Sequence, residues 1–130
     1  MTPDELKNKK MAEVIEKMKR QKAIWEEQSR LRGRKAGENW MLSGKCTYSQ
    51  AKFLEHCSIH DKFDFSTGEV GLQFLAEIIL DDEDVHILHQ STIDEMENAG
   101  IPREDLANEA FLDGFVQGAL DLWGEIKHKI

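Results

Sequence analysis

This chain is expected to fold as an all-α protein, a single-domain bundle of about five helices with a long basic N-terminal helix and a buried C-terminal helix. It has 130 residues but only two prolines, and long stretches of helix-forming residues run without interruption. Hydrophobic residues make up 40% of the chain and charged residues 32%, which is the balance of a soluble folded protein. A domain of this length can bury a core without disulfides or metals to support it.

The first helix is predicted to begin at Pro3, because proline fits the first turn of a helix. One stripe of it carries residues at spacings of four and three, namely Met11, Ile15, Met18, Lys22 and Trp25. The stripe is narrow and includes a lysine, so we expect this helix to dock on one side only. The sequence allows two ends for this helix. Either a basic loop interrupts it at residues 32–37, or it continues to Leu42, and we favour the continuous helix.

Capping boxes, in which two side chains satisfy free backbone N–H groups, predict the next two helices. Thr47 and Gln50 have the spacing of such a box, and we expect a helix from there to residues 57–60. Ser66 and Glu69 have the same spacing. The helix that they would start is apolar around most of its girth, so it should be buried.

A fourth helix is predicted over residues 84–99, with Gly100 as its left-handed terminator. Pro102 should then open the last helix at its first position, where Glu104 and Asp105 would complement the helix dipole. That helix runs to about Lys127 and is apolar on three sides, which is typical of the central element of a bundle.

Two pairs of glycines, each spaced by one helical turn, lie inside predicted helices: Gly33 with Gly37, and Gly114 with Gly118. A glycine inside a helix costs about 1 kcal/mol relative to alanine, so these positions need a compensating reason. Small residues let two helix axes approach closely. We therefore predict that each pair lies against the backbone of another helix.

Charge is divided unevenly along the chain. Residues 1–36, which we call the basic arm, hold 11 Lys or Arg against 6 Asp or Glu, a net charge of +5. Residues 37–130, the acidic body, hold 6 against 19, a net charge of −13. We treat the basic arm and the acidic body as two parts of one domain. Such asymmetry bears on binding partners rather than on the fold.

The acidic body is the first candidate for a binding surface. Its candidate partner-binding residues are Asp81, Asp82, Glu83, Asp84, Glu95 and Glu97. The run at residues 81–84 fits a solvated helix start, which the dipole favours, or a surface that binds Lys/Arg-rich partners or imitates nucleic-acid phosphates. From the second interpretation we expect a small, acidic, non-catalytic protein that binds another protein or protein complex, as a regulator or inhibitor of a nucleic-acid-handling complex.

The basic arm is the second candidate, because Lys and Arg can neutralise nucleic-acid phosphates. Its candidate contacts are Lys10, Lys17, Arg20, Arg30, Arg32, Arg34 and Lys35. Interleaved glutamates indicate ion pairs along the helix, and the acidic body would repel a duplex. A nucleic-acid-binding regulator therefore requires the arm to project away from the body. Otherwise the arm packs on the acidic body, either its own or that of a second copy in a homodimer.

A third interpretation is a metal-dependent enzyme or a zinc-stabilised domain. Thiolates and imidazoles are the ligands that zinc prefers, and the weak candidates are Cys57, His60, His86 and His89. No tight Cys-x-x-Cys pair accompanies them, and no complete catalytic motif is found. We therefore expect no metal, no cofactor and no catalytic residue.

Cysteine spacing and hydropathy predict a cytoplasmic protein. If the segment between Cys46 and Cys57 is helical, the two lie about 16 Å apart, beyond the roughly 7 Å that a disulfide spans. They should therefore be free thiols. No apolar run reaches the roughly 20 residues that a membrane span requires, and residues 1–5 do not resemble a secretory signal.

Overall fold

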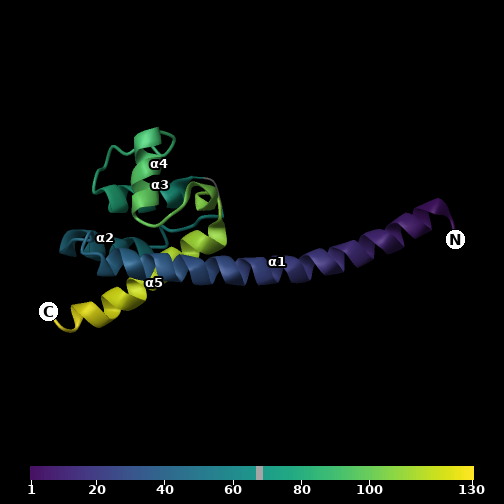
Figure 1. Ribbon diagram of the computed structural model, residues 1–130, viewed down its shortest axis with the longest axis horizontal. Coiled ribbons are helices and arrows are strands. Elements are labelled where there is room, and N and C mark those ends of the chain that lie inside the picture. The colour runs from purple at the N-terminus through teal and green to yellow at the C-terminus, as the bar shows by residue number, and fades with distance from the viewer. Residues whose placement is uncertain (67–68) are drawn as a thin grey trace.

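In the computed structural model, which describes residues 1–66 and 69–130, helix α1 (Pro3–Leu42) runs the length of the molecule (Figure 1). The elements that follow are α2 (Tyr48–Ile59), α3 (Val70–Leu80), α4 (Gln90–Asn98), the 3-10 helix η1 (Arg103–Asp105) and α5 (Glu109–Lys127). The described residues thus form five α-helices and no strand. The expected all-α bundle, with its long N-terminal helix and buried C-terminal helix, is confirmed.

Only one end of α1 belongs to the packed part of the molecule. The hydroxyl of Thr2 caps its start by accepting from the backbone N–H of Glu5, and the helix continues to Leu42, so the continuous helix that we favoured is confirmed. Every residue from 1 to 25 is exposed, whereas the other helices gather around the second half of α1 (Figure 1). We call residues 3–25 the projecting segment, which is about 35 Å long at 1.5 Å per residue.

Helix α5 is the centre of the core, as predicted. Its buried side chains face α1 on one side and α2 on another, and α3 packs on α2 and α4. The largest fully buried side chains come from several elements: Phe115, Leu54, Leu75, Ile78, Met96 and Ile101. Among the described residues, none of the helices has the length and apolar character needed to cross a membrane.

Helices α1 and α5 touch backbone to backbone through their glycines. An alanine Cβ at Gly33 would lie 2.9 Å from the carbonyl carbon of Phe111, and one at Gly37 would lie 2.9 Å from that of Phe115. Gly114 and Gly118 stand in the same relation to the carbonyl groups of Arg30 and Arg34. The predicted close approach is confirmed, and the two glycine pairs prove to face each other. Gly33 meets Phe111 and Gly37 meets Phe115, so the numbers of the contacting residues increase together along the two helices. Helices α1 and α5 therefore run in the same direction.

A buried polar network ties α1 to the start of α5. The guanidinium of Arg32 donates two hydrogen bonds to the carboxylate of Asp105, at 3.0 and 3.2 Å. The side-chain amide of Asn108 donates to Asp105 and to the hydroxyl of Ser29. The amide oxygen of Asn108 also accepts from the backbone N–H of Phe111 and so caps α5.

The start of the last helix was therefore predicted too early. Pro102 precedes the short η1 rather than opening α5, which begins at Glu109. Asp105 does not lie in the first turn of α5, and its carboxylate pairs with Arg32 instead of complementing the helix dipole. The cap is Asn108, three residues later along the chain.

The third helix also begins later than predicted. Its first residue is Val70, and Glu69 precedes it without a side-chain capping bond. The hydroxyl of Ser66 donates to the carboxylate of Asp64 instead, so Ser66 does not cap the helix. Residues 67 and 68, where the expected first turn would lie, are outside the described residues.

The fourth helix is shorter than the predicted span of residues 84–99. It begins at Gln90, and the chain from 81 to 89 is irregular. Asp81 ends α3 in the left-handed conformation, with φ of 54°. The acidic run therefore follows the end of one helix rather than starting the next. Gly100, with φ of 103°, is the predicted left-handed terminator.

Replacing Gly114 with alanine should lower the free energy of unfolding by about 1–3 kcal/mol. The added Cβ would lie 3.0 Å from the carbonyl carbon of Arg30 and closer still to its oxygen. Gly124→Ala, in the same helix, is the matched control, since nothing lies within 4 Å of its Cβ. That variant should gain up to about 1 kcal/mol. Denaturant titration measures both, and equal stabilities would show that the helices are further apart.

Replacing Asp105 with asparagine should cost about 1–3 kcal/mol at neutral pH, because the buried carboxylate of Asp105 loses its charge and its hydrogen bonds from the half-exposed guanidinium of Arg32. Burial alone would raise the pKa of the Asp105 carboxyl, but the hydrogen bonds from Arg32 and Asn108 and the charge of Arg32 bring that pKa below its ordinary value. The stabilisation is therefore present above the ordinary value near pH 4 and is lost as pH falls through the lowered pKa.

The measurement is the free energy of unfolding of wild type and Asp105→Asn from pH 7 to pH 2. We expect a constant difference down to about pH 4 and a narrowing difference below it. Asp121→Asn is the control, because the Arg34–Asp121 pair is half exposed and should contribute less than about 1 kcal/mol. A difference between wild type and Asp105→Asn that does not change with pH would contradict the account of this network.

Candidate interaction surfaces

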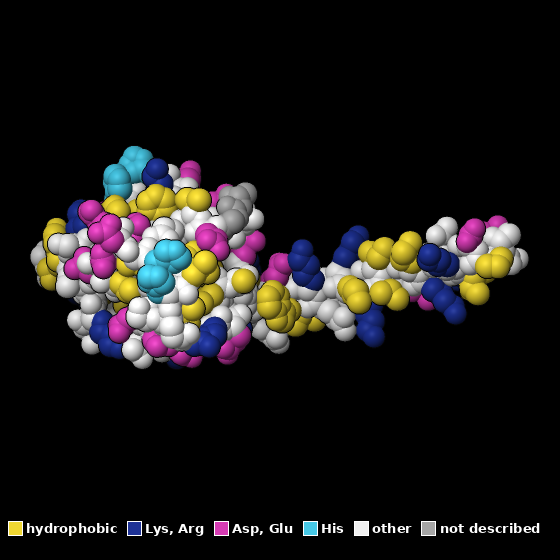
Figure 2. All heavy atoms as spheres, turned by 90° about the horizontal axis from the view of Figure 1, so that it is seen from above, with side chains coloured by type: hydrophobic (Ala, Val, Ile, Leu, Met, Phe, Trp, Pro, Cys, Tyr) yellow, Lys and Arg dark blue, Asp and Glu magenta, His cyan; other side chains and the backbone are white. Residues whose placement is uncertain are grey.

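The projecting segment carries an apolar stripe that none of the described residues covers. The side chains of the stripe are about half exposed, with Met18 at 61% and Trp25 at 54%. We define this arm stripe as Met11, Val14, Ile15, Met18 and Trp25. Figure 2 shows apolar side chains along the segment, well clear of the body. The stripe can be contacted by another molecule along its whole length.

The arm stripe continues the face of α1 that the body buries. Beyond Trp25 the same face reaches Ser29, Gly33 and Trp40 at helical spacing, and these three are buried. The face of α1 that packs on α5 through small residues is therefore exposed in the first half of the helix, where it carries large apolar side chains. The expectation that α1 docks on one side holds for the second half, whereas the first half has no partner within the described chain.

The seven candidate phosphate contacts of the basic arm fall into two groups. Three of them are engaged within the molecule: Arg30 pairs with Glu27 at 3.5 Å, Arg32 with Asp105, and Arg34 with Asp121. The others are exposed and form no ion pair with any described residue, namely Lys10, Lys17, Arg20 and Lys35. The number of cations free to meet phosphates is thus smaller than the sequence suggests.

Part of the acidic run lines a hollow between α2 and the end of α3. Its volume is about 500 Å³, and its wall includes Asp81, Asp82 and Glu83 together with Glu77 and Phe53. The far wall is held in place by Gln50, whose amide donates to the carbonyl of Ile78 at 2.7 Å. Four carboxylates and one half-exposed aromatic ring therefore line the same hollow.

These carboxylates lie where the helix dipole does not stabilise them. They follow the C-terminus of α3, which is the negative end of a helix, and no described cation pairs with Asp81, Asp82, Glu83 or Asp84. The expected helix-start interpretation of the run is thus wrong. Glu95 and Glu97 are exposed on α4 and do not line the hollow.

The metal-ligand candidates do not converge on one point. Cys57 is buried in the core, while His60 lies at the end of α2 with its ring tilted against that of His56, the ring centres 4.4 Å apart. His86 and His89 stack on each other before α4, at 4.6 Å. No group of three or more His, Cys, Asp or Glu within the described residues could hold a metal ion.

The two cysteines are free, as predicted. Burial raises the pKa of the Cys46 thiol to about 11, and burial likewise raises the pKa of the Cys57 thiol. Both are therefore protonated thiols at neutral pH, a form that is a poor nucleophile and a poor metal ligand.

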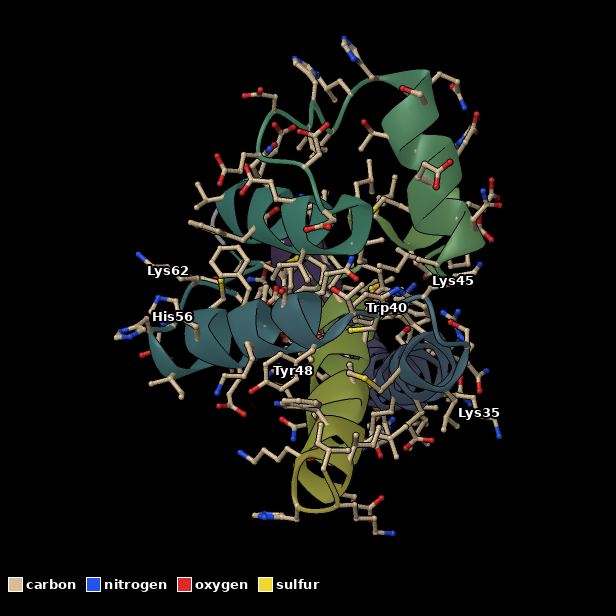
Figure 3. The ribbon with its side chains drawn as sticks, turned by 90° about the vertical axis from the view of Figure 1, so that its left-hand side faces the viewer. Lys35, Trp40, Lys45, Tyr48, His56 and Lys62 are labelled. Carbon is tan, nitrogen blue, oxygen red and sulfur yellow. The ribbon has the colours of Figure 1, made fainter. Side chains whose placement is uncertain are left out.

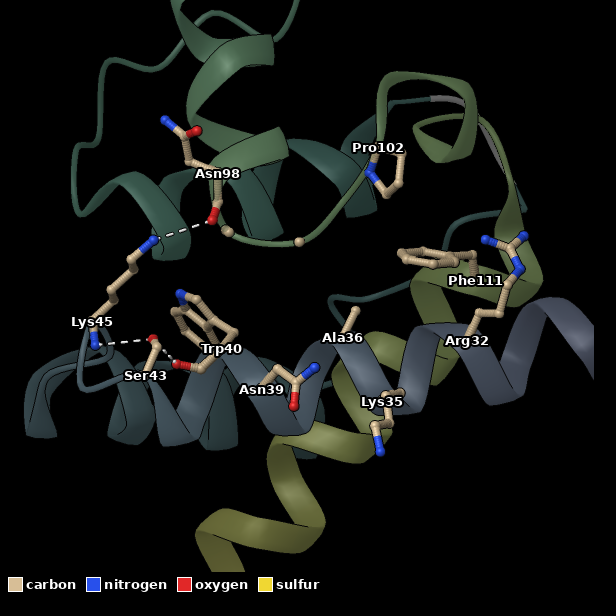
Figure 4. A pocket seen from close by; sticks show the side chains of 12 residues that line it. Arg32, Lys35, Ala36, Asn39, Trp40, Ser43, Lys45, Asn98, Pro102 and Phe111 are labelled. Atoms are coloured by element: carbon tan, nitrogen blue, oxygen red, sulfur yellow. Dashed lines mark hydrogen bonds between the residues drawn. The ribbon is translucent and has the colours of Figure 1, made fainter.

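A basic cavity between α1 and the turn after α4 was not predicted from the sequence. Its wall carries Lys35 and Trp40 from α1, Lys45 from the turn after it, and the chain around Asn98 (Figure 4). Figure 3 shows Lys35, Trp40 and Lys45 on one side of the body, away from His56 and Lys62. No local motif marks this cavity, because two segments about 60 residues apart in the sequence build it.

Comparisons with protein-family models, with curated proteins and with solved structures gave no match. The function therefore has to be argued from the residues of this chain alone.

Proposed function

We propose that this protein is a non-catalytic binding protein that docks on a partner protein through the projecting segment of α1. The observation that carries the proposal is the arm stripe, a row of apolar side chains on a helix that no other part of the described chain covers. Amphipathic helices that lay such a stripe into a groove are a recurring mode of protein recognition.

The composition of the segment suits a groove that is apolar at its floor and acidic at its rim. Burying each half-exposed side chain of the arm stripe would contribute about 1 kcal/mol. Seven Lys or Arg against four Asp or Glu give residues 3–25 a net charge of +3. Acidic residues around the groove would therefore speed association and fix the register of the helix.

The acidic hollow supports a second contact, with basic groups of a partner. Four carboxylates without a described cation surround Phe53, and an aromatic face next to carboxylates suits Lys or Arg side chains. Such a contact would fit a regulator or inhibitor of a nucleic-acid-handling complex, whose components are rich in Lys and Arg.

A nucleic-acid-binding regulator is the second candidate. The observation that favours it is the direction of the segment, which carries Lys10, Lys17 and Arg20 away from the acidic body (Figure 2). We prefer a protein partner to a nucleic acid because of the arm stripe, since contacts to phosphates do not require a row of Met, Ile and Trp side chains.

The arm stripe is tested with a double variant, Ile15→Glu with Met18→Glu. Ile24→Glu is the matched control, since Ile24 is 60% exposed on the same segment but lies off the stripe. We expect wild type and the control to retain the same stoichiometric protein in a mild affinity purification after nuclease treatment, and the double variant to lose it. Circular dichroism should show equal helix content in all three.

Retention of that protein by the double variant would contradict docking through the stripe. Nucleic acid that elutes alone and is lost at moderate salt would replace the protein partner with the second candidate.

The acidic hollow is tested with Asp82→Lys combined with Glu83→Lys, which changes two residues of its wall and leaves the left-handed Asp81 in place. We expect a fluorescent Arg/Lys octapeptide to bind about tenfold more weakly to this variant in low salt, as measured by anisotropy. Glu95→Lys with Glu97→Lys reverses the same charge outside the hollow and should have a smaller effect. Equal losses in both variants would show that net charge alone attracts the peptide.

A further inference from the structure

We propose that the basic cavity between α1 and the turn after α4 binds a small organic anion, with a carboxylate or phosphate head and a flat apolar body. The cavity measures about 450 Å³, which is within the range of small-molecule sites. Lys45 and Trp40 lie at one end, and Phe111 and Arg32 at the other (Figure 4). The proposal does not depend on the arm stripe or on the acidic hollow.

The charge of the cavity is opposite to that of the protein. Its wall contains Arg32, Lys35 and Lys45 and no Asp or Glu, although the chain carries a net charge of −8. Asp105 neutralises Arg32. The charges of Lys35 and Lys45 have no described carboxylate beside them, so these two ammonium groups make the cavity attractive to an anion.

Trp40 supplies a hydrogen-bond donor that has no acceptor. Its side chain is only 3% exposed, yet its indole N–H meets no acceptor among the described residues. The corresponding N–H of Trp123 donates to Glu55 at 2.8 Å, which is what a buried indole usually requires. No sealed side-chain nitrogen or oxygen lacks a partner in the described chain. The N–H of Trp40 therefore opens onto the cavity.

The donor and the charge lie at the same end. In Figure 4 the nitrogen edge of Trp40 points toward Lys45 and Asn98. The ammonium of Lys45 already contacts the carbonyl of Asn98 at 3.2 Å, and it has three protons to donate. An oxyanion placed between Trp40 and Lys45 could accept from both, which would satisfy the free indole N–H.

This end of the cavity is held rigid. The hydroxyl of Ser43 donates to the carbonyl of Trp40 at 2.6 Å and accepts from the backbone N–H of Lys45 at 3.3 Å. The ring of Trp40 packs on Phe115, with ring centres 5.8 Å apart. The donor set is therefore in place before a ligand arrives, which lowers the entropic cost of binding.

The other end offers an apolar surface for the body of the ligand. Ala36, Gly100 and Pro102 line it. Phe111 closes this end, with its ring buried and the guanidinium of Arg32 5.3 Å from the ring centre. Gly100 adopts φ of 103° beside Ala36, so the turn passes close to α1 without a side chain in the cavity. A flat apolar group fits such a wall better than a sugar or a flexible chain.

The direct test is a titration followed by the indole N–H resonances of the three tryptophans. The probes are 2-naphthoate, 2-naphthyl phosphate, inorganic phosphate and the uncharged 2-naphthamide. We expect one or both naphthyl anions to shift the Trp40 resonance at millimolar or lower concentration and to leave Trp25 and Trp123 unchanged. A response to the carboxylate alone or to the phosphate alone identifies the head group.

Variants then assign the donors. Trp40→Phe keeps a ring on Phe115 but removes the N–H, and Lys45→Met removes the charge; each should weaken binding by at least about tenfold in calorimetry. Lys19→Met, on the projecting segment, is the control and should not change the affinity. No shift of the Trp40 resonance with any probe, or equal binding of the uncharged amide, would overturn the proposal. The wild-type titration decides this even if a variant fails to fold.

Discussion

The close contact between α1 and α5 is the constraint on which the rest of this structure depends. Four glycines let the two backbones touch, so α5 lies directly on α1 and the remaining helices pack around it. The same contact brings Arg32 to Asp105 and Ser29 to Asn108, which fixes where α5 begins. It also ends the packed part of α1 near Ser29, because α5 does not extend further toward the N-terminus. The projecting segment is therefore a consequence of where the glycines stand.

The three surfaces follow from that geometry and differ in chemistry. The projecting segment is basic and carries the arm stripe, the hollow beside α3 is acidic, and the cavity on α1 is basic with a free indole donor. Ion pairs such as Arg32–Asp105 and Arg34–Asp121 form within the chain, but the unpaired charges of opposite sign on these three surfaces lie apart. A protein that pairs with itself through all its charges would lose these surfaces. Their separation supports the proposed function, which uses more than one contact surface.

Some local features were predicted correctly from the sequence, although the Ser66–Glu69 spacing does not cap α3, and long-range contacts were not predicted. The Thr47–Gln50 capping box and the terminator Gly100 act within a few residues, and both are found as expected. The start of α5 was missed because Asp105 is claimed by Arg32, 73 residues away along the chain. The glycine spacing indicated close helix approach but could not show that the two pairs meet. For the same reason the basic cavity was not predicted, because nothing local to Trp40 in the sequence shows that Asn98 lies across the cavity from it.

Small-angle X-ray scattering of the dilute protein tests most directly that the first half of α1 stands free. The full chain should be compared with a chain that begins at residue 26, which keeps the glycines and the Arg32–Asp105 pair. The structure predicts a longest dimension greater by about 35 Å for the full chain, with an extended tail in the distance distribution. Nearly equal dimensions for the two chains would show that the arm folds back on the acidic body, and the arm stripe would then not be available to a partner.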